Sequence, residues 1–430
     1  MVIFGKNSLR PRIRTKRFPG PRTYATLASL KKINGGWYNP VPVVLSGVGH
    51  GCFFEDIDRN RYLDFGSQIA SNPLGYNHPR LLNVLRRYHR VPIKVAGQDY
   101  IVHEHYDLLK TLLRITPGMN AGFLINSGAE ATENAIKCAL YLKKTAKFGV
   151  SFQGAFHGRT LGALSCTNAK SIHKHHYFTF PMHRLPFSET MKPAFERLLE
   201  QEAAAEDIGF VIIEPVQGEG GYHIALKDMM RDLSSLSKKY RVPLIVDEVQ
   251  TGIGRSGKWW AYQHYDFRPS IIACAKALQV GAVVARKEYF PSEPGAISTT
   301  WGGGQVLDMA LGIETIQIIK DEKLLPHVTK MGKYLVQRLH EIDVFQPRGL
   351  GLLCAFDLET KALRNNVVLE AVKHGLVVLG CGERSVRVIP PYIVTEKEID
   401  TAIEILDTSV RNCRRKGFQH KGKSCKITTC

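Results

Sequence analysis

The sequence predicts an α/β protein in which a large, mostly parallel sheet is covered by helices and a smaller α+β unit follows. Short apolar segments of strand length alternate with helical segments between about residues 105 and 285. Most of the strand segments are apolar on both faces, as buried parallel strands are. After residue 342 the pattern changes to several short strands and a closing helix, which indicates a second unit.

The elements can be predicted in order along the chain. The first 45 residues are expected to form an extended arm with a short helix near residues 24–32, and residues 51–65 a hairpin around "DRN". Strands are predicted at 121–126, 148–153, 208–215, 243–249, 270–276, 281–285, 352–358, 375–380 and 385–391. Helices are predicted at 105–115, 127–144, 226–240, over most of 306–342, and at 396–413. The helix at 127–144 opens with Ser127 and Glu130 in the spacing of a capping box.

The domain division follows the same change of pattern. Residues 1–60 are expected to form an N-terminal arm and the start of a small domain, and residues 61–325 a large domain. Residues 326–410 would complete the small domain. Residues 411–430 are a basic tail that is expected to be disordered.

The net charge of +19 belongs mainly to the two ends of the chain. The segments 1–54 and 410–430 contain many Lys and Arg and no acidic residue, whereas the remainder is almost neutral. A nucleic-acid-binding surface is therefore not favoured. No apolar run reaches the about 18 residues that a membrane span needs.

The nine cysteines are scattered without a C-x-x-C pair, so no metal site is predicted. Dispersed cysteines in apolar segments favour reduced core thiols and a cytoplasmic location. The Arg-rich, acid-free start leaves mitochondrial import as the less favoured alternative. The histidine-rich "HKHHYF" (173–178) is interpreted as a solvated loop, since its spacing suits a metal poorly.

Polar residues follow several of the predicted strands, where ligands of open α/β sheets bind. "NSGAEATEN" places a small-residue turn at a helix start that can receive an anion, and "GAFHGRT" (154–160) joins an aromatic ring, a histidine and an arginine to glycines. Glu214, Asp247 and Lys276 end apolar strands. "STTWGGG" (298–304) is a second, Thr/Gly-rich loop of anion-binding type. A lysine, buried carboxylates, an aromatic ring and two anion-binding loops together suit pyridoxal 5'-phosphate (PLP), whose aldehyde bonds to a lysine and whose ring nitrogen needs a carboxylate.

The motifs "NSGAEATENAIK", "GAFHGRTLGAL", "EPVQGEGG" and "DEVQTGIGRSGKWWA" resemble those of class III PLP-dependent aminotransferases, and the resemblance runs from about residue 19 to residue 400. It implies PLP fold type I, with a mostly parallel seven-stranded sheet. Lys276 would hold the cofactor and move the proton, Asp247 would pair with the ring nitrogen, Phe156 would stack on the ring and Gln250 would lie near the ring oxygen. The remaining cofactor-binding residues implied are Ser127, Gly128, Ala129, His157, Glu214 and Thr300. Thr300 would reach the cofactor of a neighbouring subunit, so the resemblance also implies a homodimer.

Within this class the sequence is most similar to enzymes for a terminal (ω) amine, with 4-aminobutyrate favoured as donor and 2-oxoglutarate as acceptor, giving glutamate and a semialdehyde. Arg159 would hold the distal carboxylate of the donor, and Arg387 the second carboxylate of the acceptor. Glu219 would mask Arg387 during the amine half-reaction. Lysine 6-, ornithine and acetylornithine aminotransferases, amine–pyruvate enzymes, and racemases or aminomutases of the same fold remain alternatives. Gly304, Ile389 and "ALQVG" depart from the usual pattern, which leaves the substrate open.

Overall fold

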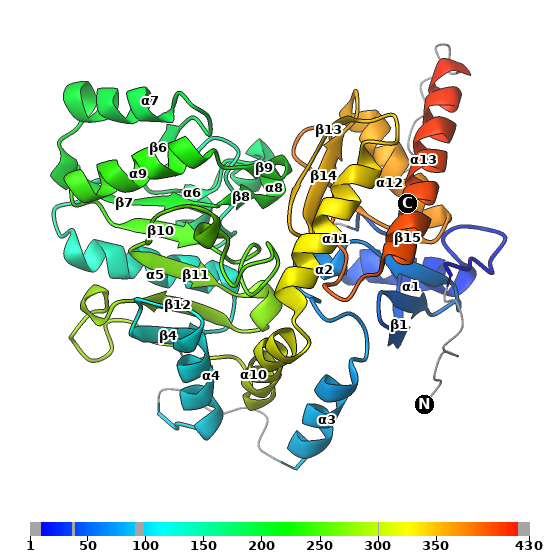
Figure 1. The fold of residues 1–430 in the computed structure, drawn as a ribbon, viewed down its shortest axis with the longest axis horizontal. Helices are drawn as coiled ribbons and strands as arrows, with labels where there is room; N and C mark the ends of the chain where they lie inside the picture. Colours follow the sequence, from blue (N-terminus) through cyan, green and yellow to red (C-terminus); the bar gives the residue numbers. More distant parts are fainter. Residues whose placement is uncertain (1–9, 37–38, 91–98, 300, 420–430) are drawn as a thin grey trace. The chain divides into compact units, whose positions relative to one another are not determined.

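The computed structural model describes residues 10–36, 39–90, 99–299 and 301–419. Their contacts divide the chain into two compact units, residues 79–328 and residues 1–78 with 329–430 (Figure 1). This division follows contacts, whereas the predicted one at residues 60, 325 and 410 followed sequence pattern, so the predicted domain boundaries stay a prediction.

The unit 79–328 is built on the predicted seven-stranded sheet, in the order β4-β12-β11-β10-β7-β5-β6. These strands are β4 (Ala121–Ile125), β12 (Gly281–Ala285), β11 (Ile271–Cys274), β10 (Leu244–Asp247), β7 (Ile208–Ile213), β5 (Phe148–Phe152) and β6 (Met182–Leu185). Strand β12 runs antiparallel to both neighbours, and the other neighbouring pairs are parallel. The prediction of a mostly parallel sheet is confirmed.

Helices surround this sheet (Figure 1). They are α3 (Pro79–Tyr88), α4 (His103–Arg114), α5 (Gly128–Leu142), α6 (Leu161–Cys166), α7 (Met191–Arg197), α9 (Lys227–Lys239) and α10 (Val306–Asp321). A short hairpin of β8 (Val216–Gln217) and β9 (His223–Ile224) flanks α8 (Gly218–Gly221). Helix α5 packs on β10, β11 and β12 through small side chains such as Ala131, Ala135 and Ala139, which are fully buried. Small residues allow this close approach, which fixes where α5 begins relative to the strand ends.

The second unit contains two four-stranded sheets. One has the order β1-β2-β3-β15 and the other β13-β14-β17-β16. The strands are β1 (Leu45–His50), β2 (Phe53–Asp56), β3 (Arg61–Asp64), β13 (Phe345–Leu350), β14 (Leu353–Asp357), β15 (Leu376–Val377), β16 (Leu379–Cys381) and β17 (Ser385–Val388). The predicted hairpin at 51–65 is β2–β3 and is confirmed.

The helices of this unit are α1 (Pro21–Ile33), α2 (Ser67–Ala70), α12 (Lys361–Lys373) and α13 (Glu396–Gln419), while α11 (Leu324–Leu339) begins just before the boundary between the units. Helix α13 continues to Gln419, so the structure is helical in the first part of the segment that was expected to be a disordered tail. Its later residues lie outside the described part of the chain. The described helices include none that is long and apolar enough to cross a membrane.

Candidate active site

The carboxyl ends of the parallel strands bring the predicted polar residues to one edge of the large sheet. Asp247 is the last residue of β10 and pairs in register with Ala273 of β11. Lys276 follows two residues after β11 ends, and its backbone N–H donates to the Val249 carbonyl oxygen at 3.2 Å. Because the two strands are parallel neighbours, the carboxylate and the amine belong to the same edge.

Asp247 and His157 form a buried pair at this edge. His157 Nδ1 and Asp247 Oδ2 are 2.8 Å apart, and both side chains are almost fully buried. A carboxylate can only accept, so the contact requires the proton on Nδ1. The Val249 N–H donates to the second oxygen of Asp247 at 2.9 Å. These contacts fix the orientation of a carboxylate that would otherwise be costly to bury.

The backbone of His157 is held as firmly as its ring. Its N–H donates to Thr167 Oγ1 at 3.0 Å, and its carbonyl oxygen accepts from Thr132 Oγ1 at 2.9 Å. Thr132 lies in α5 and Thr167 directly after α6. The loop "GAFHGRT" is therefore tied to two helices, which gives the His157–Asp247 pair a rigid support.

Glu214 follows β7 and joins two loops. One of its oxygens accepts from the Phe156 N–H and the other from the Gly218 N–H, both at 2.9 Å. The pKa of Glu214 is raised to about 7. Burial is the main cause and the nearby Asp247 adds to it, while His157 and the two backbone amides lower the pKa. Glu214 thus positions Phe156 through a hydrogen bond to its backbone N–H.

Gln250 lies against α8. Its side-chain oxygen accepts from the Tyr222 hydroxyl at 2.8 Å, and a Cβ on Gly218 would lie 2.4 Å from the same oxygen. Only a glycine fits at position 218 without displacing Gln250. The segment 217–222 is therefore closely packed on the loop that follows β10.

The turn before α5 touches the same edge. Ser127 caps α5, its Oγ accepting from the Glu130 N–H at 3.2 Å, whereas the Glu130 carboxylate accepts from the Asn126 N–H at 2.7 Å. The predicted capping box is thus only half present, because Glu130 reaches past Ser127 to Asn126. A Cβ on Gly128 would lie 2.7 Å from Val249 Cγ1. The helix start, with Gly128 and Ala129, is consequently in contact with the loop after Asp247.

The chemistry of this set fits PLP. The amino-terminal end of the 15-residue helix α5 offers backbone N–H groups and a favourable dipole to a phosphate. Glycine at 128 keeps the turn close enough to the Asp247 loop for one small ligand to meet both. Asp247 would supply a carboxylate for the ring nitrogen, Lys276 an amine for the aldehyde and Phe156 an aromatic ring for the face of the cofactor.

Arg159 and Glu219 are the predicted substrate-binding residues of this unit, and each has a partner that the sequence did not predict. The Arg159 guanidinium is exposed, and its Nη2 lies 3.3 Å from Nε2 of His173. Lys170 donates from Nζ to Glu219 Oε1. The interpretation of residues 173–178 as a solvated loop holds for Phe178, which is 94% exposed, but is wrong for the partly buried His173.

Two further predicted site residues are not among the described residues of this unit. Arg387 lies on β17 of the other unit, buried between its neighbours in register Ala355 and Leu379. Thr300 lies outside the described residues, although its neighbour Thr299 accepts a hydrogen bond from the Asn126 side chain at 3.1 Å. The described His, Cys, Asp and Glu residues form no group of three or more that could hold a metal ion.

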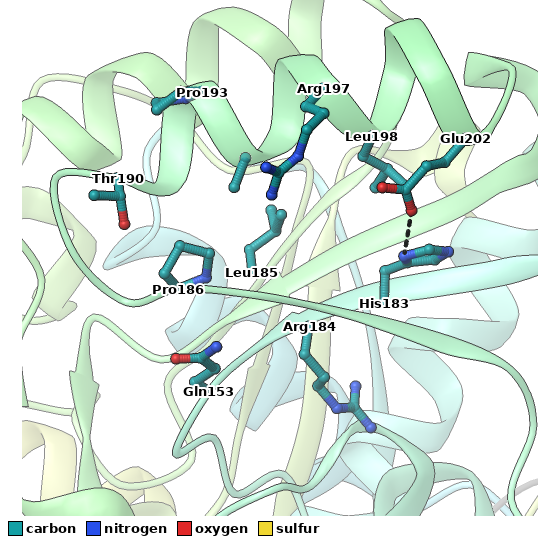
Figure 2. A pocket seen from close by; sticks show the side chains of 11 residues that line it. Gln153, His183, Arg184, Leu185, Pro186, Thr190, Pro193, Arg197, Leu198 and Glu202 are labelled. Atoms are coloured by element: carbon teal, nitrogen blue, oxygen red, sulfur yellow. Dashed lines mark ion pairs between the residues drawn. The ribbon is translucent and has the colours of Figure 1, made fainter.

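A separate cavity of about 470 Å³ opens beside β6 and α7 (Figure 2). Arg197 points into it from α7, and His183 faces Glu202 at its rim, 3.9 Å apart. The Arg184 guanidinium is already occupied by Ser151 and by the carbonyl oxygen of Ser165. None of the predicted site residues lines this cavity, so it is not the site described above.

Known proteins resemble the chain in sequence and in fold. The family profile described as "Aminotransferase class-III" matches residues 37–410. The chain is 36% identical over 364 residues to acetylornithine aminotransferase of Archaeoglobus fulgidus, covering 83% of this chain and 93% of the relative. It is 30% identical over 435 residues to mitochondrial 4-aminobutyrate aminotransferase of Mus musculus, covering 87% and 86%.

A solved structure is similar over almost the same length. It is described as lysine aminotransferase from M. tuberculosis in the internal aldimine form, with a TM-score of 0.84 and 28% identity. The match covers 91% of this chain and 99% of that structure. The relatives thus share a reaction class and a fold, but their names give three different amine donors.

Proposed function

Because the chain belongs to the class III aminotransferases, we propose that it transfers the terminal amine of an ω-amino acid to 2-oxoglutarate, with 4-aminobutyrate as the favoured donor. The enzymes of this class are PLP-dependent transaminases. When bound, PLP supplies a protonated ring that withdraws electrons from the substrate carbon bearing the amine. The chain's own residues have to bind, orient and move protons around that ring.

The buried contact of His157 with Asp247 is the observation that carries the catalytic part of the proposal. Asp247, oriented by His157, is proposed to keep a proton on the ring nitrogen. Lys276 is proposed to hold the cofactor and to carry the proton taken from the substrate carbon on its Nζ. Phe156 is proposed to cover the ring face, since Glu214 fixes its backbone.

The other cofactor contacts are proposed from the packing of the two loops. Ser127, Gly128 and Ala129 would bind phosphate with backbone N–H groups at the start of α5. Gln250, oriented by Tyr222, would face the ring oxygen. Thr300 is proposed to reach the phosphate of a neighbouring subunit, which makes the active form a homodimer.

The choice of an ω-amine rests on a chemical feature that the named relatives' substrates share. Acetylornithine, 4-aminobutyrate and lysine all carry an amine at the end of the chain opposite a carboxylate. Arg159 is proposed to hold that carboxylate, and its exposed guanidinium leaves room for it. The higher identity to an acetylornithine enzyme makes acetylornithine the second candidate donor.

The acceptor 2-oxoglutarate has two carboxylates and needs a second cation, for which Arg387 is proposed. Glu219 is proposed to pair with Arg387 while the amine reacts and to leave it when the acceptor binds. The contact of Lys170 with Glu219 adds a competitor to this exchange. Glu219 would therefore exchange between two cations, Lys170 and Arg387, instead of only leaving Arg387.

A substrate panel tests the proposal. The purified holoenzyme is assayed with 2-oxoglutarate or pyruvate against 4-aminobutyrate, lysine, ornithine and N-acetylornithine, with Lys276→Ala as the inactive control. We expect 4-aminobutyrate with 2-oxoglutarate to have the highest kcat/KM. Racemised or shifted product without consumption of the keto acid would overturn the transaminase assignment for these amines, and a preference for another donor would overturn the favoured substrate.

The exchange of Glu219 is tested by measuring the two half-reactions separately in Glu219→Ala. We expect the amine half-reaction to slow and the 2-oxoglutarate half-reaction to be retained, because the second cation would no longer be masked. Equal rates in wild type and variant for both half-reactions would refute the exchange.

A further inference from the structure

His173 connects two residues of the proposed site that have separate tasks. Its Nε2 lies 3.3 Å from Nη2 of Arg159. Its ring also meets the ring of Phe156 edge to face, with centroids 5.5 Å apart and an angle of 74° between the planes. Among the described residues, the Arg159 guanidinium has its hydrogen-bond contact with His173.

The chemistry of the contact fixes the state of the imidazole. A guanidinium can only donate, so His173 Nε2 must accept, and a ring nitrogen accepts only when it carries no proton. The proton of the neutral ring then sits on Nδ1, which is buried and has no hydrogen-bond partner among the described residues. Protonation would remove the acceptor and add a cation beside Arg159.

We infer that His173 is a positioning residue that holds the Arg159 guanidinium for the substrate carboxylate and, through its edge contact, steadies Phe156. The inference rests on the proposed function, because Arg159 must be the carboxylate-binding group. Neutral His173 leaves Arg159 oriented, and protonated His173 releases it. Binding of the carboxylate should therefore weaken in acid, while the chemical step at Lys276 is little affected.

The surroundings decide the direction of the pH effect. Burial is the main cause that lowers the pKa of His173 below its ordinary value of 6.5, and Arg159 and Lys170 lower it further, while Glu219 opposes them. Arg159 faces the ring from the 154–160 loop, Lys170 precedes it in its own segment, and Glu219 lies in α8. The Lys170–Glu219 contact partly cancels those two charges, so Arg159 is the cation left to disfavour protonation.

Two substitutions separate the acceptor from the ring. His173→Phe keeps an aromatic edge for Phe156 but removes the acceptor, whereas His173→Gln keeps an acceptor that does not titrate. We expect His173→Phe to raise KM for the amine donor about tenfold at neutral pH with kcat nearly unchanged, as loss of a hydrogen bond to a charged group would. We expect His173→Gln to restore KM and to abolish its rise in acid. His176→Phe, in the same loop but exposed, is the matched control and should behave as wild type.

The assay uses the holoenzyme and whichever amine the substrate panel shows to react fastest, from about pH 5 to about pH 8. A second readout is the inhibition constant of valerate, a carboxylate without an amine, over the same range. Equal pH profiles of KM and of valerate inhibition in wild type, His173→Phe and His173→Gln would overturn the inference even if transamination is confirmed. A panel without any reactive ω-amine would overturn the proposed function, and valerate would then test the Arg159–His173 anion site alone.

Discussion

Glu248 offers a quantitative test of the reasoning about buried charge. It follows Asp247 at the end of β10 and is 1% exposed, and it forms no ion pair with the described residues. Its carboxylate accepts from the Tyr262 N–H at 2.8 Å and from the Thr251 hydroxyl. Burial is the main cause that raises the pKa of Glu248 from its ordinary value of 4.5 to about 7.

The sign of the pH effect follows from this direction. Between pH 4.5 and about pH 7 the folded state keeps a proton that the unfolded state has released, so stability falls as the pH rises through this window. Above the window both states are ionised and the loss is complete. At about 1.4 kcal/mol for each pH unit of the window, the carboxylate costs about 3 kcal/mol at alkaline pH.

Glu248→Gln removes the ionisation and keeps the contacts, because the amide oxygen still accepts from Tyr262 and the amide nitrogen can donate to Thr251. We expect the variant to match wild type in free energy of unfolding near pH 4.5 and to exceed it by about 3 kcal/mol near pH 8. Urea unfolding of the cofactor-free protein at fixed concentration, followed by tryptophan fluorescence, measures both values. The control Glu189→Gln changes an exposed carboxylate and should stay within about 0.5 kcal/mol of wild type. A difference that does not grow with pH would show that Glu248 is charged in the folded protein and would refute the reasoning.

Two further substitutions test the packing around the cofactor site. In Gly281→Ala the new Cβ would lie 2.4 Å from the Ser127 carbonyl oxygen, so we expect a loss of about 1–3 kcal/mol in unfolding free energy and faster loss of PLP on dialysis. Gly35→Ala, with no atom within 4 Å of the added Cβ, is the control, and equal PLP retention in the two variants would contradict this view of the turn. Thr167→Val leaves the His157 N–H without its acceptor, and we expect it to cost about 1–3 kcal/mol in urea unfolding, whereas wild-type stability would show that the loop rearranges freely.

The large sheet could be predicted because its strands are short, apolar on both faces and separated by helices. The reversed direction of β12 was not predicted, since "GAVVA" is equally apolar in either direction. The chain nevertheless contained a signal: only residues 275–280 connect β11 to β12. Two parallel strands need a crossover connection of about a dozen residues or more. A connection as short as this one therefore permits only an antiparallel pair.

The strands β6 and β13 were missed for a different reason. Strand β6 lies at the edge of its sheet and reads "MHRL", with intermediate burial over most of its length. Strand β13 also lies at an edge and is largely exposed or half-buried. Edge strands need fewer apolar residues than central ones, so the alternation of apolar segments that identified the other strands is weak in both.

The residues that surround Arg159 could not be predicted from the ends of strands, because these residues do not directly follow a strand in the sequence. Lys170 and His173 come after α6, and their positions depend on how the segment 167–173 folds back over Phe156. A histidine-rich segment looks solvated in the sequence, and most of its residues are. Only the three-dimensional return of the chain separates His173 from the exposed histidines beside it.

The pair "DE" at the end of β10 shows most clearly what spacing alone leaves open. Asp247, the last residue of β10, and Glu248, the next residue, are both buried and differ by one methylene, but their side chains meet different groups. Asp247 meets a histidine, while Glu248 meets a backbone amide and a hydroxyl. The partners differ in kind: Asp247 has a histidine ring beside it, whereas burial next to neutral donors raises the pKa of Glu248. One strand end therefore carries two buried carboxyl groups in different surroundings, and the proposed task at the ring nitrogen belongs to the one with the histidine partner.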